Sequence, residues 1–230
     1  FSNKTALTIN ALAGDDTITL NNPNVPTSLT TVTVDGGASI NDTVLLNGST
    51  GTDTLAYTAT GTHSGILDLT TAAGTVTYNL NNVKALQVDG LAPTAAPGDA
   101  LTVTTAHATI TPGLDPGTGR VDPVDASGNP LLSLTYAGIE SATVTGTTAV
   151  IQGSAQNDMI RAAASGVVTV TNPLGFNNSV DVSAFNRIVI NALGGDDSIT
   201  IASSALFPGG ITVIGGDNGP GSDQVSVTDP

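Results

Sequence analysis

Two stretches of the sequence decide the fold: LTINALAGDDTITL at residues 7–20 and IVINALGGDDSITI at residues 188–201. Nine of the 14 aligned positions are identical, and the second stretch starts at an offset of 181 from the first. In both copies, aliphatic residues alternate with polar ones on either side of a Gly-Asp-Asp turn. This pattern is typical of two short β-strands joined by a corner. The pair therefore predicts a β-rich chain that contains a long internal repeat.

The repeat continues downstream of these stretches. Two further blocks match in the same order: TVDGG (33–37) with TVIGG (212–216), and NDTV (41–44) with SDQV (222–225). Residues 182–230 therefore repeat residues 1–49, and residues 50–230 amount to one full period of the repeat. We interpret residues 1–49 as the C-terminal part of one unit of a tandem array.

The full period divides by composition into three parts. Residues 50–90 and 136–230 are rich in strand-like segments that end in Gly, Asn or Asp turns. Residues 91–135 contain six of the 12 prolines. Because proline cannot donate a hydrogen bond to a central strand ladder, we expect this part to be a looser linking segment.

Composition and spacing together indicate the fold class. Hydrophobic residues make up 39% of the chain and are mostly aliphatic, whereas aromatic residues make up 3% and Cys and Trp are absent. Strong helix formers are rare, so an all-β fold is expected. The spacing from Ile9 to Val32 recurs from Ile190 to Val213, and it suits one coil of a solenoid. We therefore predict a parallel β-helix or β-solenoid, with a tandem β-sandwich of Ig-like or cadherin-like domains as the alternative.

The charge of the chain excludes several function classes. The chain contains five Lys and Arg residues and 19 acidic residues, which gives a formal net charge of −14. Nucleic-acid binding needs clustered Lys and Arg, so we expect no nucleic-acid partner.

No apolar run approaches the roughly 18 residues that span a bilayer, so we expect no membrane insertion. His63 and His107 have no neighbouring motif of a nucleophilic triad, and we expect no enzymatic activity.

Several motifs resemble a known class of repeats. GSAQNDMI at 153–160 is similar to the segment found beside RTX (haemolysin-type) calcium-binding repeats, and the stretches NALAGDDTITL (10–20) and NALGGDDSITI (191–201) resemble degenerate nonapeptides of that class. With YAGIESATVTG at 136–146, the chain resembles giant, Thr-rich surface and secreted proteins of bacteria. The resemblance implies a β-solenoid or adhesin-like, non-enzymatic repeat, located outside the cell or on its surface.

The aspartates of the turns are candidate calcium ligands. Calcium takes six to eight hard oxygen ligands, which carboxylates and turn carbonyls supply. If coils stack, Asp15 or Asp16 is expected near Asp35, and Asp196 or Asp197 near Asp217. The alternative is that these residues only stabilise turns at solvated corners. The candidate ligands are Asp15, Asp16, Asp35, Asp42, Asp158, Asp196, Asp197, Asp217 and Asp223.

These observations predict a structural repeat of a long extracellular or cell-surface fibre or rod. Each unit would bury its aliphatic faces on its neighbours, so the expected partners are copies of the chain or adjacent repeats, joined head to tail. The alternative function is a calcium-dependent stalk of a tandem-domain adhesin. A cell-surface or carbohydrate ligand remains open in both cases.

Overall fold

The computed structural model describes residues 4–23, 28–39, 41–91, 98–173, 177–203, 205–217 and 221–228. Within these ranges the chain forms 21 β-strands and no helix, which confirms the all-β prediction. The described ranges contain no helix of the length and apolarity needed to cross a membrane.

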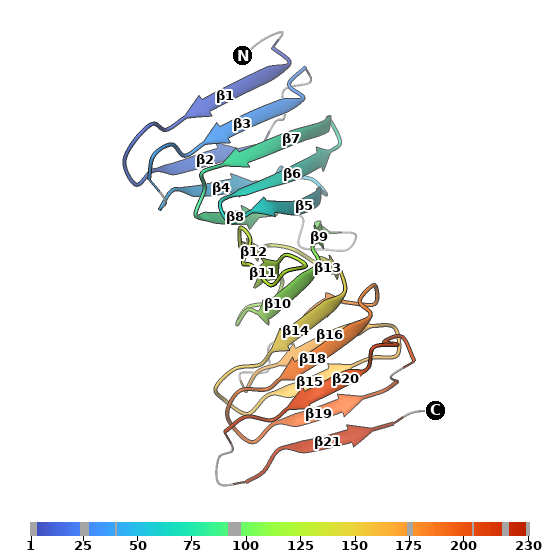
Figure 1. Ribbon diagram of the computed structural model, residues 1–230. Helices are drawn as coiled ribbons and strands as arrows, with labels where there is room; N and C mark the ends of the chain where they lie inside the picture. Colours follow the sequence, from blue (N-terminus) through green and yellow to red (C-terminus); the bar gives the residue numbers. More distant parts are fainter. Residues whose placement is uncertain are drawn as a thin grey trace.

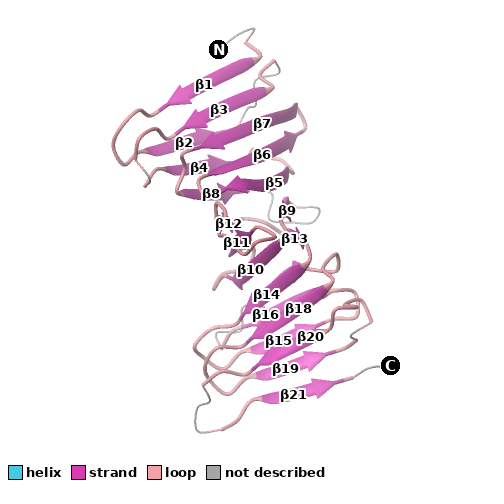
Figure 2. Cartoon of the chain, in the orientation of Figure 1, coloured by secondary structure: helices cyan, strands magenta, loops and turns pink. Residues whose placement is uncertain are grey.

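The strands of the described residues form two sheets, which we call sheet A and sheet B (Figure 2). Sheet A has twelve strands, in spatial order β1 (Ala6–Asn10), β3 (Thr31–Asp35), β7 (Gly74–Asn81), β6 (Ser64–Thr71), β5 (Thr54–Gly61), β9 (Ala100–Thr104), β13 (Ser141–Thr145), β17 (Asn177–Asp181), β16 (Val167–Thr171), β15 (Met159–Ala162), β19 (Ser198–Ile201) and β21 (Gln224–Val227). Sheet B has nine, in spatial order β2 (Thr17–Asn21), β4 (Thr43–Asn47), β8 (Ala85–Asp89), β12 (Leu134–Ala137), β11 (Gly119–Val124), β10 (His107–Pro112), β14 (Thr148–Gln152), β18 (Arg187–Asn191) and β20 (Ile211–Ile214).

The chain coils between the two sheets, as the solenoid prediction requires. Strands from successive coils pair in parallel, for example β1 with β3 and β2 with β4. Parallel pairing distinguishes the fold from the antiparallel sandwich alternative. Ile190 pairs with Val213, as the expected coil spacing requires, whereas Ile9 pairs with Val34 rather than with Val32. The strands stack along one axis, with β1 at one end and β21 at the other (Figure 1).

Three antiparallel meanders interrupt the simple coil. The first meander is β5–β6–β7 in sheet A, the second is β10–β11–β12 in sheet B, and the third is β15–β16–β17 in sheet A. The first strand of each meander lies two strand positions further along its sheet than the last strand. The chain then runs back, so that the last strand pairs in parallel with the strand of the preceding coil in the same sheet. All other strand pairs among the described residues are parallel.

The core lies between the two sheets. In β3 the inward side chains Val32 and Val34 are buried, while Thr31 and Thr33 are half-buried on the outer side. The same alternation occurs in β4, where Val44 and Leu46 are buried. Period-two alternation of this kind places one face of each strand against the opposite sheet. One aliphatic cluster therefore runs along the inside of the rod.

The proline-rich part, residues 91–135, differs from the expected linking segment where the structure describes it. It holds β9, β10 and β11, and their inward side chains Leu101, Ile110 and Val121 belong to the common core. Pro123 lies within β11, but its carbonyl accepts a hydrogen bond from Leu131 outside the regular ladder. Since N and C=O of an extended residue face the same edge, the missing N–H costs no bond to β10. Pro123 therefore fits within β11, where it is paired with Ala108 of β10.

Candidate functional site

An acidic residue stands immediately before the first residue of many strands. At these corners the chain turns from one sheet into the next, and most of the acidic side chains are at least partly buried, whereas Glu140 is exposed. Asp42, Asp53, Asp99, Asp158 and Asp197 are almost completely buried. The corner residues are Asp16 before β2, Asp42 before β4, Asp53 before β5, Asp99 before β9, Glu140 before β13, Asp158 before β15, Asp197 before β19 and Asp223 before β21.

These corner residues form carboxylate ladders along the rod. In the middle ladder, the backbone N–H of Asp53 donates to Asp99 Oδ1 at 2.7 Å. The backbone N–H of Asp99 then donates to Glu140 Oε2 at 2.6 Å. Each carboxylate thus accepts the N–H of the corner residue on the preceding coil of the same sheet. Hydrogen bonds from backbone N–H to an ionised carboxylate are stronger than neutral ones, so the ladder fixes the register of adjacent corners.

Two further ladders have the same geometry. In the N-terminal ladder, the Asp16 N–H donates to Asp42 Oδ1 at 2.7 Å. In the C-terminal ladder, the Asp158 N–H donates to Asp197 Oδ1 at 2.7 Å, and the Asp197 N–H donates to Asp223 Oδ1 at 3.0 Å. The sequence repeat places Asp16 and Asp42 at the positions of Asp197 and Asp223. The repeat therefore preserves the ladder as well as the strands.

In the middle and C-terminal ladders, a serine donates hydrogen bonds to the first carboxylate of the ladder. The Ser49 hydroxyl donates to Asp53 Oδ1 at 2.7 Å, and its backbone N–H donates to Asp53 Oδ2. In the equivalent place, the Ser154 N–H donates to Asp158 Oδ2. The corresponding sequence is G-S-x-x-x-D at residues 48–53 and 153–158. This motif marks the first rung of a ladder.

The ladders leave several carboxylate oxygens without a partner. Buried oxygens with no hydrogen-bond partner among the described residues are Asp16 Oδ2, Asp42 Oδ2, Asp99 Oδ2, Asp158 Oδ1 and Asp197 Oδ2. Burial raises the pKa of Asp99 to about 6; the N–H of Asp53 opposes this shift, and neighbouring carboxylates add to it. Burial also raises the pKa of Asp197 above its usual value. Burial without full pairing disfavours the charged form of a carboxyl group.

The expected calcium ligands separate into inward and outward groups. Asp16, Asp42, Asp158, Asp197 and Asp223 belong to the ladders. Asp15 and Asp196 face outward: Asp15 Oδ1 accepts a hydrogen bond from Ser39 Oγ at 2.5 Å, and the Asp196 carboxylate accepts one from the Gly221 N–H at 3.1 Å.

The remaining two candidates, Asp35 at the end of β3 and Asp217 in an isolated bridge with Gly194, lie outside the ladders. Asp35 Oδ1 accepts hydrogen bonds from the Gly37 N–H at 3.0 Å and from Asn82 Nδ2 at 2.8 Å. The backbone of Asp217 hydrogen bonds with Leu193 and Gly195. Hydrogen bonds therefore join Asp16 to Asp42 and Asp197 to Asp223, rather than to Asp35 and Asp217.

The described carboxylates are arranged in ladders along the rod. Among the described residues, no group of three or more His, Cys, Asp or Glu side chains lies close enough to hold a metal ion. The corners offer carboxylates one above another, each partly engaged by a backbone N–H, whereas calcium takes six to eight oxygens. Residues 218–220, in the corner before Asp223, lie outside the described residues. Calcium binding therefore stays a prediction of the sequence resemblance.

Three ladder residues were not among the sequence candidates: Asp53, Asp99 and Glu140. Their signal is present in the sequence, because each is followed by a strand that alternates inward aliphatic residues, as in D-T-L-A-Y at 53–57. These single acidic residues lack the Gly-Asp-Asp turn that distinguishes Asp16 and Asp197. Glu140, the only Glu of the chain, occupies the last rung of the middle ladder.

The two ends of the rod expose core-type side chains. The C-terminal end rung consists of β20 and β21, and there Val225 and Val227 are 52% and 61% exposed. Their equivalents in the first copy, Val44 and Leu46, are fully buried.

In the N-terminal end rung, β1 and β2, it is the first copy of the repeat that is more exposed than the second. Its inward residues Leu7, Ile9, Ile18 and Leu20 are only partly buried, while their equivalents Ile188, Ile190, Ile199 and Ile201 are buried. Among the described residues, no rung covers the aliphatic stripe at either end.

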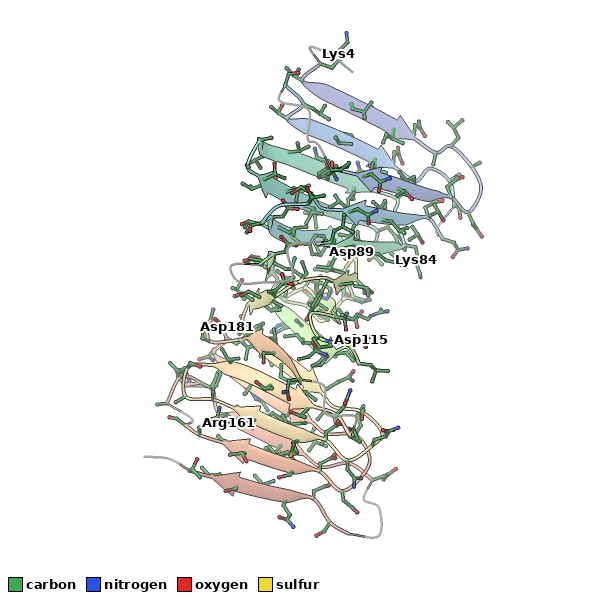
Figure 3. The ribbon with its side chains drawn as sticks, turned by 180° about the vertical axis from the view of Figure 1, so that it is seen from behind. Lys4, Lys84, Asp89, Asp115, Arg161 and Asp181 are labelled. Atoms are coloured by element: carbon green, nitrogen blue, oxygen red, sulfur yellow. The ribbon has the colours of Figure 1, made fainter. Side chains whose placement is uncertain are left out.

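The rest of the described surface has several depressions and the few cations of the chain. One depression of about 430 Å³ is lined by Tyr136, Glu140 and Asn178 among others, and the Glu140 carboxylate accepts a hydrogen bond from the Asp99 N–H. Lys4, Lys84 and Arg161 lie at well separated levels along the rod (Figure 3). Among the described residues, the one ion pair joins Arg120 to Asp122 at 2.6 Å. Lys84 and Arg120 line one shared depression of about 320 Å³, together with His63.

Comparisons of the chain with protein-family models, with curated proteins and with solved structures found no match. The functional argument therefore rests on the geometry of the ladders and of the end rungs.

Proposed function

We propose that the chain is a structural repeat of a long extracellular or cell-surface rod, in which repeats stack end to end through their β-sheets. The mechanism is mechanical. Each coil covers the aliphatic stripe of the coil before it, and the carboxylate ladders hold neighbouring corners in register. A solenoid of this type gains stability from contacts between adjacent coils, so it grows by adding further coils.

The exposed end rungs carry this proposal. Val225 and Val227 have the spacing and orientation of core residues, yet more than half of each side chain is exposed. Covering the exposed half of a Val side chain contributes about 1 kcal/mol of hydrophobic free energy, so both ends favour a further rung. Unpaired strand edges also recruit other strands unless a cap covers them.

The acidic surface suits an extracellular rod. With a net charge of −14, neighbouring rods repel one another laterally, whereas stacking at the ends buries mainly aliphatic groups. The absence of cysteine means that stability must come from the solenoid itself rather than from disulfides. Charge thus favours growth along the axis over side-by-side aggregation.

Sedimentation velocity and electron microscopy of the 230-residue chain test the proposal. We expect concentration-dependent association into filaments, because both ends carry uncovered strands. Val225→Lys places a charge on the inward stripe of β21 and should abolish association. Ser226→Lys changes the outward neighbour on the same strand and should leave it intact. A stable monomer at high concentration, with no filaments, would contradict self-stacking and favour independently folded units.

A further inference from the structure

We propose that consecutive repeats exchange sheets, so that the C-terminal end rung is covered by the next repeat with its β7-like strand on β20 and its β8-like strand on β21. In a tandem array, the structural period would then be two sequence repeats rather than one. This inference rests on the proposed rod function and names the segment that fits the exposed end.

The two copies of the repeat already lie in opposite sheets. β1 belongs to sheet A, but its sequence equivalent β18 belongs to sheet B. The same exchange holds for the next three pairs: β2 and β19, β3 and β20, β4 and β21. The register within each copy is unchanged, since Leu7 pairs with Val32 as Ile188 pairs with Ile211.

An odd number of steps between the sheets causes the exchange. Along the described chain, eleven steps from one sheet to the other separate β1 from β18, if each meander counts as one visit to its sheet. An even number would return the repeat to its own sheet, whereas eleven steps correspond to five and a half turns of the coil. The chain leaves β4 of sheet B for the first meander in sheet A. It must therefore leave β21 of sheet A for a meander in sheet B.

The exchange also balances the two sheets. Each meander adds two strands to its sheet, and the described residues contain two meanders in sheet A but one in sheet B. At about 4.8 Å per strand, one extra meander per repeat would lengthen one sheet by about 10 Å relative to the other. Alternation gives each sheet three meanders in every two repeats. Two facing sheets can then stay aligned along the rod.

The first copy shows which residues would cover the exposed end. Val44 and Leu46 of β4 are paired with Leu86 and Val88 of β8. In the second copy, Val225 and Val227 occupy the positions of Val44 and Leu46. A second segment with the sequence of β8 therefore fits the stripe on β21.

The same argument places the β7-like strand. Val32 and Val34 of β3 are paired with Tyr78 and Leu80 of β7. Their equivalents Ile211 and Val213, in β20, are only partly buried. The occupant of the end rung is thus the segment equivalent to residues 74–89 in the following repeat.

Cysteine cross-linking in a two-repeat chain distinguishes the possible arrangements. The chain consists of residues 1–230 followed directly by a second copy of residues 50–230, and it is free of native cysteines. In the first copy, Thr33 pairs with Asn79, so Thr33→Cys with Asn79→Cys is the positive control. The equivalent test pair is Thr212→Cys with Asn79→Cys of the appended copy. The competing pair is Ser226→Cys with the same appended Asn79→Cys.

Sheet exchange predicts that the Thr212 pair cross-links as fully as the control and that the Ser226 pair does not. A cross-link only in the Ser226 pair would overturn the exchange while the rod itself stands. If neither forms while the control does, the repeats fold as separate units, and the rod function fails as well.

A second cysteine pair controls for the case in which one variant misfolds. Leu45 pairs with Gln87 in the first copy, so Ser226→Cys should cross-link with Gln87→Cys of the appended copy. The pair Thr212→Cys with that Gln87→Cys should not cross-link. The reverse result would contradict the exchange.

Discussion

Residues 1–49 and 182–230 have nearly the same local structure but opposite burial. Leu12 and Leu193 have φ of 76° and 75°, and Gly37 and Gly216 both have φ of 96°. The N–H of the first corner aspartate donates to the second in both copies. Yet β4 is buried where β21 is exposed, and β18 is buried where β1 is partly exposed. Sequence sets the conformation of each rung, whereas the next rung sets its burial.

The corners show how strongly the local sequence acts. A positive φ is strained for leucine, because its Cβ crowds the backbone in this conformation. Asn10 Oδ1 compensates in the first copy by accepting the Leu12 N–H at 3.1 Å. Gly37 and Gly216 then approach the carbonyls of Leu12 and Leu193 so closely that a Cβ would lie 1.9 and 1.6 Å from the oxygen. Both copies therefore need glycine at this point of the next corner.

The largest contrast between the copies is expected at Gly36 and Gly215. A Cβ on Gly36 would lie 2.2 Å from the backbone oxygen of Asn82 in the covering rung, whereas a Cβ on Gly215 would lie 2.1 Å from Oδ2 of Asp223, at the end of a side chain that can move more easily than backbone. We expect Gly36→Ala to lower the free energy of unfolding by about 3 kcal/mol and Gly215→Ala by less than about 1 kcal/mol. Chemical denaturation measures both. Equal losses would mean that the covering rung does not cause the difference.

The next contrast is between Val44 and Val225. Val44→Ala removes two buried methyl groups and should cost about 2 kcal/mol, because the packed surroundings cannot fully close the cavity. Val225→Ala changes a half-exposed side chain and should stay within about 0.5 kcal/mol. In the two-repeat chain, the cost of Val225→Ala should rise to that of Val44→Ala. A cost that stays low there would show that no rung covers β21.

The middle ladder has further coils on both sides and serves as a reference. Its buried Asp99 predicts that the free energy of unfolding depends on pH. The pKa of Asp99 is raised from 3.8 to about 6, so folding favours its protonated form. The resulting stability is fully present below pH 3.8 and is lost as the pH rises through 6. The free energy of unfolding should therefore be about 1 kcal/mol larger at pH 5 than at pH 7.

A matched pair of variants separates Asp99 from the other titrating groups. Asp99→Asn should remove this part of the pH dependence, whereas Asp115→Asn, at an exposed loop position, should keep it. If both variants follow the wild-type curve, the ladder carboxylate does not titrate in this range.

The smallest effect is expected from calcium removal. A ligand that binds only the folded state raises stability by mass action, so removing bound calcium would lower the melting temperature. At the Asp16–Asp42 and Asp197–Asp223 corners, backbone N–H groups are the hydrogen-bond donors to the ladder carboxylates. Excess EDTA should therefore shift the melting temperature by less than about 1 °C. A clear drop would reveal bound calcium. Asp197→Asn in the same assay would then show whether this corner holds it.

The sequence predicted the all-β class and the parallel solenoid, because strand alternation and the corner turns are local patterns. The meanders were not predicted: residues 54–81 contain three strands with the same alternation as successive coils, and only the tertiary pairing shows that they lie in one sheet. Proline content suggested a linking segment at 91–135, but Pro123 lies where no ladder bond is needed.

The candidate site was predicted in part. Asp16, Asp42, Asp158, Asp197 and Asp223 were singled out, but their partners were not, because pairing depends on which corners the stacking brings together. Asp53, Asp99 and Glu140 were not singled out because they carry no Gly-Asp-Asp turn, although Asp53 shares the G-S-x-x-x-D pattern of Asp158. Asp53 and Asp99 are buried directly before a strand, whereas Glu140 at the same kind of position is exposed.

Hydrogen exchange of β4 and β21 tests the central claim, that the end rung is an ordinary rung without its cover. In the 230-residue chain, the amides of β21 should exchange much faster than those of the equivalent strand β4. In the two-repeat chain, the amides of the same residues 224–227 should slow to the rates of β4, because a further strand then pairs with this edge. Exchange at β21 that stays fast after the second repeat is added would contradict the account.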